Sequence, residues 1–372
     1  MKVAVIKLGS RISFGANDCS GANGEARSIC KMLKLGGAEV HIFTKILKKD
    51  TLVEEYQWHD LTDWCGLDNE LQGTKIDALV VLNGTVQFYG GVEDKEQLYN
   101  YSMINEFKGP VFYVYCDPEL TLKQVWPSVS KKDWAGNWSE ELLNITRSDI
   151  IYLSQPYDTE KVMKDLKKNE IIPAKMVHFP FEQFPCLNEN LPFNPIPEVD
   201  LSYGGTMRGG KRIKKMVKFY FGHPEDISVE MFGKIKAEDF EPKQYLGHRL
   251  PNFSGPVKYD DMLSKMNKAM AHCVIGDPYY EQINDMPQRT YESISSNVVT
   301  FIDHDMDKLR RVYGRDKVLA DFLYVQSREE LSDKIQLLKA DINLRQQILE
   351  DQFAAINFDP KKYCESFVEL LK

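Results

Sequence analysis

The sequence lacks the features that mark several large protein classes. Its seven cysteines are odd in number and scattered, with no CxxC pair, so we expect reduced thiols and neither a disulfide framework nor a metal site. No apolar run approaches the roughly 18 residues that a membrane span needs. Residues 1–7 have the pattern of a first strand and not that of a signal peptide. We therefore expect a cytoplasmic protein with no membrane partner.

Two common nucleotide-binding signatures are also missing. No glycine-rich loop ends in Gly-Lys-Ser/Thr, which excludes a Walker A loop, and the first βα turn lacks the GxGxxG pattern typical of nicotinamide dehydrogenases. The net charge of -8 argues against a partner bound by bulk electrostatics alone, such as nucleic acid, although a local basic patch can override it. The missing signatures disfavour a P-loop enzyme and a dehydrogenase.

What the chain does contain is an alternation of strand and helix patterns in two halves. Its 372 residues suffice for two domains with separate cores. Apolar runs predict strands at residues 3–8, 40–43, 76–82, 111–116, 150–153, 176–179, 199–203, 229–232, 272–275 and 298–302.

The boundaries between the halves follow from prolines and from the end of the chain. Residues 181–197 are proline-bearing and lack periodicity, which predicts a linker. Residues 358–372 form an amphipathic helix that we expect to cross back to the first half. The predicted fold class is α/β, with two Rossmann-like domains facing a central cleft: residues 1–180 completed by 358–372, and residues 198–357.

A basic, glycine-rich loop joins an expected strand to an expected helix in the second half. Its sequence is YGGTMRGGKR, at residues 203–212. Gly204 and Gly205 permit close backbone approach, the helix start offers unpaired N–H groups, and Arg208 and Arg212 add positive charge. The loop therefore suits a diphosphate. The competing interpretation is a flexible basic loop before a surface helix.

Two carboxylates in the first half follow expected strands. Asp117 comes directly after the strand at residues 111–116, where apolar surroundings favour proton uptake and hence a general base. Glu25 lies at the mouth of the loop that follows the first strand, beside an expected helix start. Each has an alternative: Asp117 could cap a turn, and Glu25 could face the helix dipole.

A second helix start carries opposite charges one turn apart. Arg289 and Glu292 share a face, so the cation can meet phosphate and the carboxylate can accept both hydroxyls of a ribose. A helix-surface ion pair is the alternative. Further strand ends in this half reach Phe232-Gly233 and Gly276-Asp277.

Taken in order, these motifs resemble the DNA β-glucosyltransferase family of T-even phages, whose architecture is called GT-B. The resemblance covers nearly the whole chain. It is carried by MKVAVI at residues 1–6, FYGG at 88–91, Asp117, WPSV at 126–129, the loop at 203–212, Phe232-Gly233, FSG at 253–255, IGD at 275–277 with Tyr280, and residues 289–292.

The resemblance implies an inverting glycosyltransferase. It would move a sugar, glucose first, from a UDP-sugar to 5-hydroxymethylcytosine in duplex phage DNA, with the target base flipped out of the stack, and so protect that DNA from host nucleases. Carried over by position, Asp117 would be the catalytic base and Glu25 the second acidic residue facing the sugar. Arg208, Arg212 and Arg289 would hold the diphosphate, Glu292 the ribose, and Gly204, Gly205, Phe232, Gly233 and Asp277 would line the nucleotide.

Several points stay open at this level. The same reaction could use a pentose donor, UDP-arabinose. A GT-B transferase with a non-DNA acceptor and a non-catalytic protein that binds nucleotide-sugars are further alternatives. The resemblance also implies that a divalent cation, magnesium or manganese, can assist release of the diphosphate, although no ligand cluster in the sequence demands one. We expect a monomer that works in the host cytoplasm if a phage encodes it.

Overall fold

The computed structural model divides the chain into two compact units, Met1–Pro180 with Asp359–Lys372 and Phe181–Phe358. We call them unit 1 and unit 2. The structure describes residues 1–7, 12, 14, 21–46, 52–63, 70–71, 74–82, 102–115, 147–167, 175–206, 209–235, 248–276 and 278–372.

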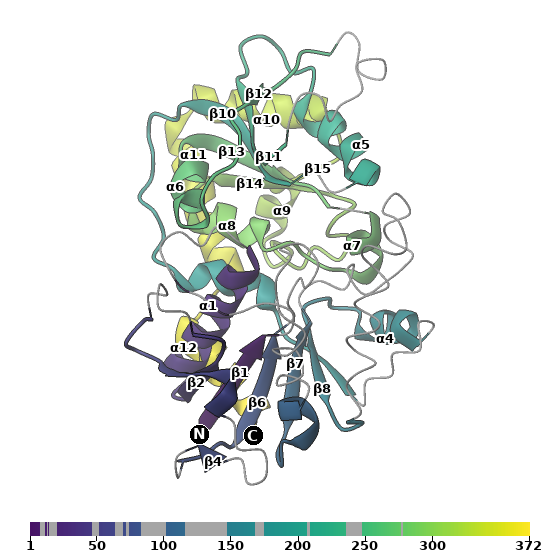
Figure 1. The fold of residues 1–372 in the computed structure, drawn as a ribbon. Helices are drawn as coiled ribbons and strands as arrows, with labels where there is room; N and C mark the ends of the chain where they lie inside the picture. Colours follow the sequence, from purple (N-terminus) through teal and green to yellow (C-terminus); the bar gives the residue numbers. More distant parts are fainter. Residues whose placement is uncertain are drawn as a thin grey trace. The chain divides into compact units, whose positions relative to one another are not determined.

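Unit 1 is built on a seven-stranded parallel sheet of order β3-β2-β1-β6-β7-β8-β9 (Figure 1). Its central strands are continuous apolar runs because both faces of a parallel sheet are covered. The strands are β1 (Lys2–Lys7), β2 (Glu39–Phe43), β3 (Gln57–His59), β6 (Ala78–Leu82), β7 (Val111–Tyr115), β8 (Ile151–Ser154) and β9 (Lys175–His178), with a separate antiparallel pair, β4 (Glu70–Leu71) and β5 (Thr74–Lys75).

The last helix of the chain belongs to unit 1. The last helix is α12 (Pro360–Leu370). Unit 1 also contains α1 (Gly21–Leu35), α4 (Thr159–Lys167), the 3-10 turn η1 (Leu61–Asp63) and helical residues at 102–106. Asp359 caps α12 by accepting a hydrogen bond from the backbone N–H of Lys362 at 3.0 Å. The rings of Tyr363 and Phe367 each lie 5.0 Å from that of Phe179. The predicted return of the C-terminal helix to the first domain is thus confirmed.

Unit 2 contains a second parallel sheet, of order β12-β11-β10-β13-β14-β15. Chain order reverses between β10 and β13, and such switch points form the ligand crevice of open α/β sheets. The strands are β10 (Val199–Thr206), β11 (Val229–Lys234), β12 (Asn252–Phe253), β13 (Ala269–Val274), β14 (Val299–Asp303) and β15 (Tyr324–Val325).

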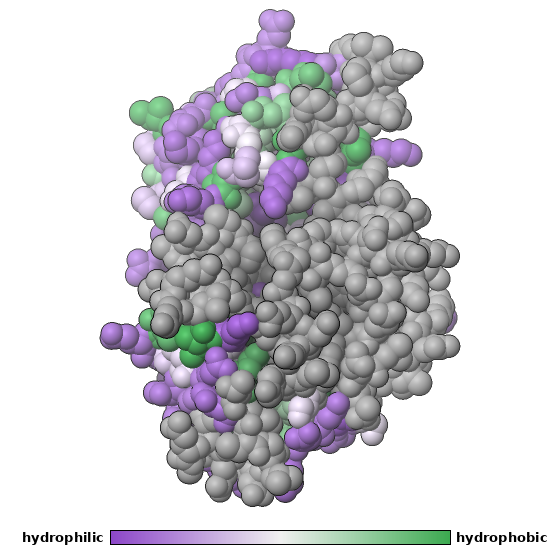
Figure 2. Space-filling view, viewed as in Figure 1, coloured by the Kyte–Doolittle hydropathy of each residue, from purple (hydrophilic) through white to green (hydrophobic). Residues whose placement is uncertain are grey.

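Helices cover both faces of this sheet. In Figure 1, α5 and α10 lie over one face, and α6, α8, α9 and α11 lie over the other. Their bounds, with those of α7 and a 3-10 turn, are α5 (Gly209–Tyr220), η5 (Tyr259–Asp261), α6 (Met262–Asn267), α7 (Pro278–Ile283), α8 (Arg289–Ser295), α9 (Lys317–Leu323), α10 (Arg328–Ala340) and α11 (Ile342–Ile356). Hydrophilic side chains predominate among the described residues on the face drawn in Figure 2. No helix among the described residues is long and apolar enough to cross a membrane.

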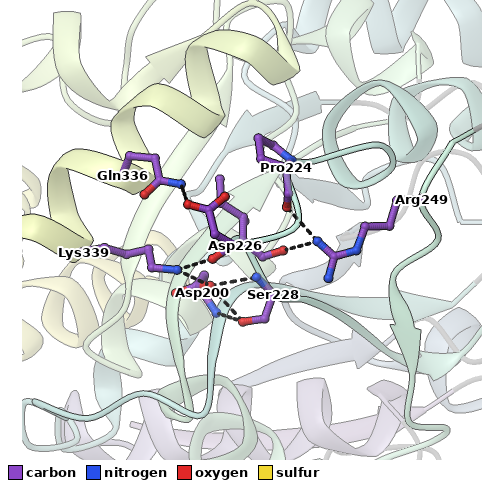
Figure 3. Close-up of polar contacts among 8 residues, drawn as sticks. Asp200, Pro224, Asp226, Ser228, Arg249, Gln336 and Lys339 are labelled. Carbon is purple, nitrogen blue, oxygen red and sulfur yellow. Dashed lines mark hydrogen bonds and ion pairs between the residues drawn. The ribbon is translucent and has the colours of Figure 1, made fainter.

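Polar contacts fasten α10 to the amino ends of β10 and β11 (Figure 3). The carboxylate of Asp200 accepts hydrogen bonds from the backbone N–H of Ser228 at 2.7 Å, from its hydroxyl at 2.9 Å and from Lys339 Nζ at 3.0 Å. Gln336 donates to the carboxylate of Asp226, and Arg249 Nη1 donates to the carbonyl of Pro224 at 2.7 Å. Asp200, Asp226 and Arg249 at this edge of the sheet are therefore engaged in contacts that stabilise the fold.

The segment predicted as a linker differs from that prediction. Its first part is a 3-10 helix, η3 (Phe181–Leu187), that packs against α8, and Glu182 within it is 3% exposed. Further along, the carbonyl oxygens of Asn194 and Pro195 accept hydrogen bonds from Arg345 Nη2 at 3.1 and 2.9 Å. Prolines remove backbone donors and break periodicity, but side chains of unit 2 satisfy the carbonyls, so residues 181–197 are packed onto that unit.

Docking of α12 on α1 can be tested at Gly36, which follows α1. A Cβ at this position would lie 2.5 Å from both the carbonyl oxygen of Cys364 and a methyl of Val368. We expect Gly36→Ala to destabilise unit 1 by roughly 1–3 kcal/mol through overpacking, measured by urea denaturation. The exposed neighbour Leu35, changed to Ala, should shift stability by less than about 0.5 kcal/mol. Equal stability of Gly36→Ala and the parent would show that α12 does not pack on α1 in this way.

Glu182 should make unit 2 less stable as pH rises. Burial raises the pKa of its carboxyl group to about 7, against the opposing charge of Arg311. The folded state therefore holds the proton over a pH range where the unfolded chain has lost it, and stability falls from about pH 4.5 up to about pH 7. Glu182→Gln should abolish this decline and raise the free energy of unfolding at pH 8 by about 3 kcal/mol, seen as a higher melting temperature. A parent whose stability rises over this pH range would contradict the assignment.

Candidate active site

The carboxyl ends of the unit 2 strands bring several predicted site residues to one edge of the sheet. Gly204 and Gly205 end β10, and Phe232 and Gly233 lie near the end of β11. Because α8 runs back from this edge to β14, Arg289 in its first turn lies at the same edge. Residues almost 90 positions apart are thus gathered at the switch point of the sheet.

Gly204 is the point where three of these residues meet. A Cβ built on it would lie 2.5 Å from the ring of Phe232 and 2.6 Å from Nη1 of Arg289. Real Cβ atoms essentially never approach other atoms so closely. The guanidinium and the aromatic ring can therefore reach the backbone of β10 only because residue 204 has no side chain. The backbone of β10 at Gly204 and Gly205 thus forms a surface without side chains, which we call the glycine floor, and the Arg289 guanidinium and the Phe232 ring lie against it.

Gly233 holds β11 against β10 beside this floor. Its φ is +114°, and a Cβ there would lie 1.8 Å from the carbonyl oxygen of its register partner Gly205. The N–H of Gly233 donates to the carbonyl of Gly255 at 2.7 Å. Only glycine meets both the positive φ and the close backbone contact.

Arg289 and Glu292 form an ion pair, with 2.8 Å between Nε and Oε2. Their side chains are 24% and 10% exposed, so this is not the solvated surface pair that was the alternative interpretation. His272 of β13 is fully buried within reach of the Arg289 charge. Burial and then that charge lower the pKa of its imidazole to about 3. A neutral imidazole leaves the guanidinium as the positive charge at this point, which suits an anionic ligand.

Two neighbours of Phe232 were not predicted from the sequence. Lys265 of α6 lies with its ammonium 5.7 Å from the centre of the Phe232 ring and pairs with Glu230 at 2.7 Å. Nη1 of Arg289 donates a hydrogen bond to the sulfur of Met262 at 3.2 Å. No local motif marks these residues, because their proximity depends on α6 packing against α8.

A second cluster that the sequence did not indicate surrounds Lys215 of α5. Its ammonium contacts Glu281 at 2.6 Å, Asp303, and Asp305 at 3.5 Å. Burial lowers the pKa of Lys215, but the hydrogen bonds with Asp303 and Glu281 outweigh it and the pKa lies above its ordinary value. These contacts tie α5 to α7, to the end of β14 and to the loop that follows it.

The remaining predicted residues fall into two groups. Arg212 is half-buried in the first turn of α5, and Glu25 is half-buried in α1. Because α1 begins at Gly21, Glu25 lies beyond its first turn, where the helix dipole has little effect. Asp117, Arg208 and Asp277, together with the motifs at residues 88–91 and 126–129, lie outside the described residues.

A cavity of about 290 Å³ lies elsewhere, at the amino edge of the unit 2 sheet. Its lining includes Tyr220, His223 and Arg249 but none of the predicted site residues. Both ring nitrogens of His223 are already bonded, to the hydroxyl of Ser332 at 2.9 Å and the carbonyl of Phe219 at 2.8 Å. This cavity is therefore not the candidate active site.

Two units that are each built on a parallel sheet, with glycines at the switch point of the second sheet, have the architecture of the GT-B fold. Comparison with solved structures agrees: T4 phage β-glucosyltransferase in complex with UDP-glucose matches with a TM-score of 0.76 and 23% identity, over 100% of both chains. The same enzyme with UDP and Mn²⁺ matches with a TM-score of 0.75 and 25% identity, also over 100% of both chains.

Sequence comparison finds similarity to a known family. Residues 1–185 match the family model described as bacteriophage T4 β-glucosyltransferase. The chain is 27% identical over 367 residues to the DNA β-glucosyltransferase of Enterobacteria phage T4, covering 98% of this chain and 97% of that protein. The chain is thus similar to the bacteriophage T4 β-glucosyltransferase family over nearly its whole length.

The glycine floor makes a direct prediction for nucleotide binding. Gly204→Ala should displace Phe232 or Arg289 and weaken binding of UDP by roughly tenfold or more, equivalent to about 1.4 kcal/mol, measured by titration calorimetry. Gly37→Ala is the matched control, because no atom lies within 4 Å of its Cβ and its φ of +87° affects stability alone. Unchanged UDP affinity in folded Gly204→Ala would contradict this site.

Proposed function

We propose that this protein transfers glucose from UDP-glucose to 5-hydroxymethylcytosine in duplex DNA, with inversion at the sugar carbon. It would do so as a monomer in the host cytoplasm and protect phage DNA from nucleases. The observation that carries the proposal is the meeting of Gly204, Phe232 and Arg289 at the switch point of unit 2, in a chain similar to the bacteriophage T4 β-glucosyltransferase family.

Unit 2 would hold the donor. The bare backbone at Gly204 and Gly205 lets the nucleotide lie close to β10, and Phe232 and Gly233 would line the same floor. Arg289 would bind the diphosphate from within its pair with Glu292, whose carboxylate would accept the ribose hydroxyls. Arg212, in the first turn of α5, and by position Arg208 and Asp277 would complete the donor site.

Unit 1 would carry the acid–base chemistry. Asp117 follows β7 in the chain, and by position it would take the proton from the hydroxymethyl group of the acceptor. The resulting oxygen nucleophile would form a bond to the sugar carbon as the bond to UDP breaks, and the positive groups of unit 2 would stabilise the leaving diphosphate. Glu25 would face the sugar as the second acidic residue. No covalent sugar–enzyme bond is needed for one inverting step.

The acceptor requires a change in the DNA. A hydroxymethyl group on a stacked base is out of reach of a carboxylate in a pocket, so the nucleotide would be flipped out of the duplex. A magnesium or manganese ion would neutralise charge on the departing diphosphate. Within the described residues no group of three or more His, Cys, Asp or Glu could hold such an ion, so no step is assigned to it.

Mass spectrometry of nucleosides tests the reaction and its alternatives together. Duplex DNA containing 5-hydroxymethylcytosine would be incubated with the protein and an equal mixture of UDP-glucose and UDP-arabinose, then digested. A hexose-sized gain is the expected result, whereas a pentose-sized gain would replace glucose by arabinose as the donor sugar. No gain with UDP binding intact would favour a non-DNA acceptor or a non-catalytic protein.

Asp117 gives the sharpest test of mechanism. Asp117→Asn should lower the rate of transfer by roughly 100-fold or more, because a general base contributes about that much, while UDP affinity stays at the parent value. The control is Asp158→Asn, a substitution at a carboxylate in the turn before α4. Transfer at the parent rate by Asp117→Asn would remove Asp117 from the role of base.

A further inference from the structure

The later part of the connection between β14 and α9, together with the first residues of α9, carries an excess of positive charge in an acidic chain. The whole protein has a formal net charge of -8, yet residues 308–318 contain five cationic side chains and one carboxylate. The five cations are Lys308, Arg310, Arg311, Arg315 and Lys317, and the carboxylate is Asp316. We call these residues the basic loop.

The basic loop lies at the same sheet edge as the candidate donor site. It follows the carboxyl end of β14, and all strands of this sheet are parallel, so it shares an edge with Gly204 and Gly233. Just before it, Met306 packs against Gly276 of the loop after β13, where a Cβ would lie 1.8 Å from the Met306 sulfur. Arg311 donates to the carbonyl of Asn284, in the connection that leads to α8 and Arg289.

The backbone of the basic loop is firmly held. The buried carboxylate of Asp307 accepts from the N–H groups of Arg311 and Val312, each at 3.0 Å, and from the hydroxyl of Tyr324 at 2.6 Å. At the other end Asp316 caps α9 by accepting from the N–H of Leu319 at 3.0 Å. A rigid backbone presents its side chains without a further ordering cost on binding.

Two of the five cations have partners within the protein, and the other three make no ion pair among the described residues. Arg310 pairs with Asp321 at 2.8 Å, and Arg311 lies against Asp307 and the carbonyl of Asn284. Lys308, Arg315 and Lys317 are exposed, and none has an ion pair within 4.0 Å among the residues that the structure describes. Lys317 is attracted to Asp321, with which Arg310 already pairs, and all three side chains remain exposed to an external anion.

We propose that Lys308, Arg315 and Lys317 bind backbone phosphates of the acceptor duplex. The inference rests on the proposed function, because duplex DNA is the polyanion that must come to this edge of unit 2 for transfer to occur. An acidic protein gains no long-range attraction to DNA from its net charge, so its phosphate contacts must be local. Contacts of this kind fix the position of the duplex and carry no sequence information.

The test compares two variants that each lose three positive charges. One is Lys308→Gln/Arg315→Gln/Lys317→Gln, and the control is Lys361→Gln/Lys362→Gln/Lys372→Gln at the C-terminal helix. Fluorescence anisotropy would give the dissociation constant of a hydroxymethylcytosine duplex at several salt concentrations. The basic-loop variant should bind at least about tenfold more weakly at low salt, and the slope of log K against log salt should fall by about 2 to 3. Its UDP affinity and melting temperature should match the parent.

A charge-conserving variant guards against a purely structural effect. Lys308→Arg/Arg315→Lys/Lys317→Arg should keep the parent slope and affinity. The inference would be overturned if the Gln variant of the basic loop bound DNA as tightly as the parent, or if the C-terminal control lost as much DNA affinity. Either result would leave the proposed transfer of sugar to DNA unaffected. A parent protein that neither binds duplex DNA nor transfers sugar to it would overturn the proposed function and this inference together.

Discussion

The structure of unit 2 depends on a backbone contact that excludes side chains. At the carboxyl ends of β10 and β11, Gly205 and Gly233 are register partners, and a single Cβ on Gly233 would overlap the carbonyl oxygen of Gly205. One residue earlier, Gly204 leaves room for the guanidinium of Arg289 and the ring of Phe232. The close approach produces a bare floor of polypeptide, which is the surface that a diphosphate can lie against without a steric penalty.

The two edges of the unit 2 sheet use their charges differently. At the amino edge, Lys339 of α10 donates to the Asp200 carboxylate and to the backbone carbonyl of Asp226, and Gln336 of α10 donates to the Asp226 carboxylate, so these groups stabilise the packing of α10. At the carboxyl edge, Arg289 is held by Glu292 but remains partly exposed, and the basic loop keeps three exposed cations. The carboxyl edge also holds structural ion pairs, such as those of Lys215, but it combines them with these exposed cations, which make no ion pair among the described residues.

The sequence predicted the elements that rest on local patterns. Continuous apolar runs located the buried strands, because both faces of the sheets are shielded from water. The short strands β3, β4, β5, β12 and β15 were missed because two or three residues carry no periodicity. The contacts of Lys215 and Lys265 were missed because their partners are distant in sequence and meet only through packing. The roles of Asp117, Arg208 and Asp277 stay predictions.

The central claim is that Arg289 and Glu292 are a nucleotide clamp and not only a structural ion pair. A crystal structure of the protein with UDP tests it most directly. The account predicts diphosphate oxygens within hydrogen-bond distance of the Arg289 guanidinium, and both ribose hydroxyls donating to the Glu292 carboxylate above the floor at Gly204. UDP bound elsewhere, with Arg289 and Glu292 in contact only with protein atoms, would contradict the account.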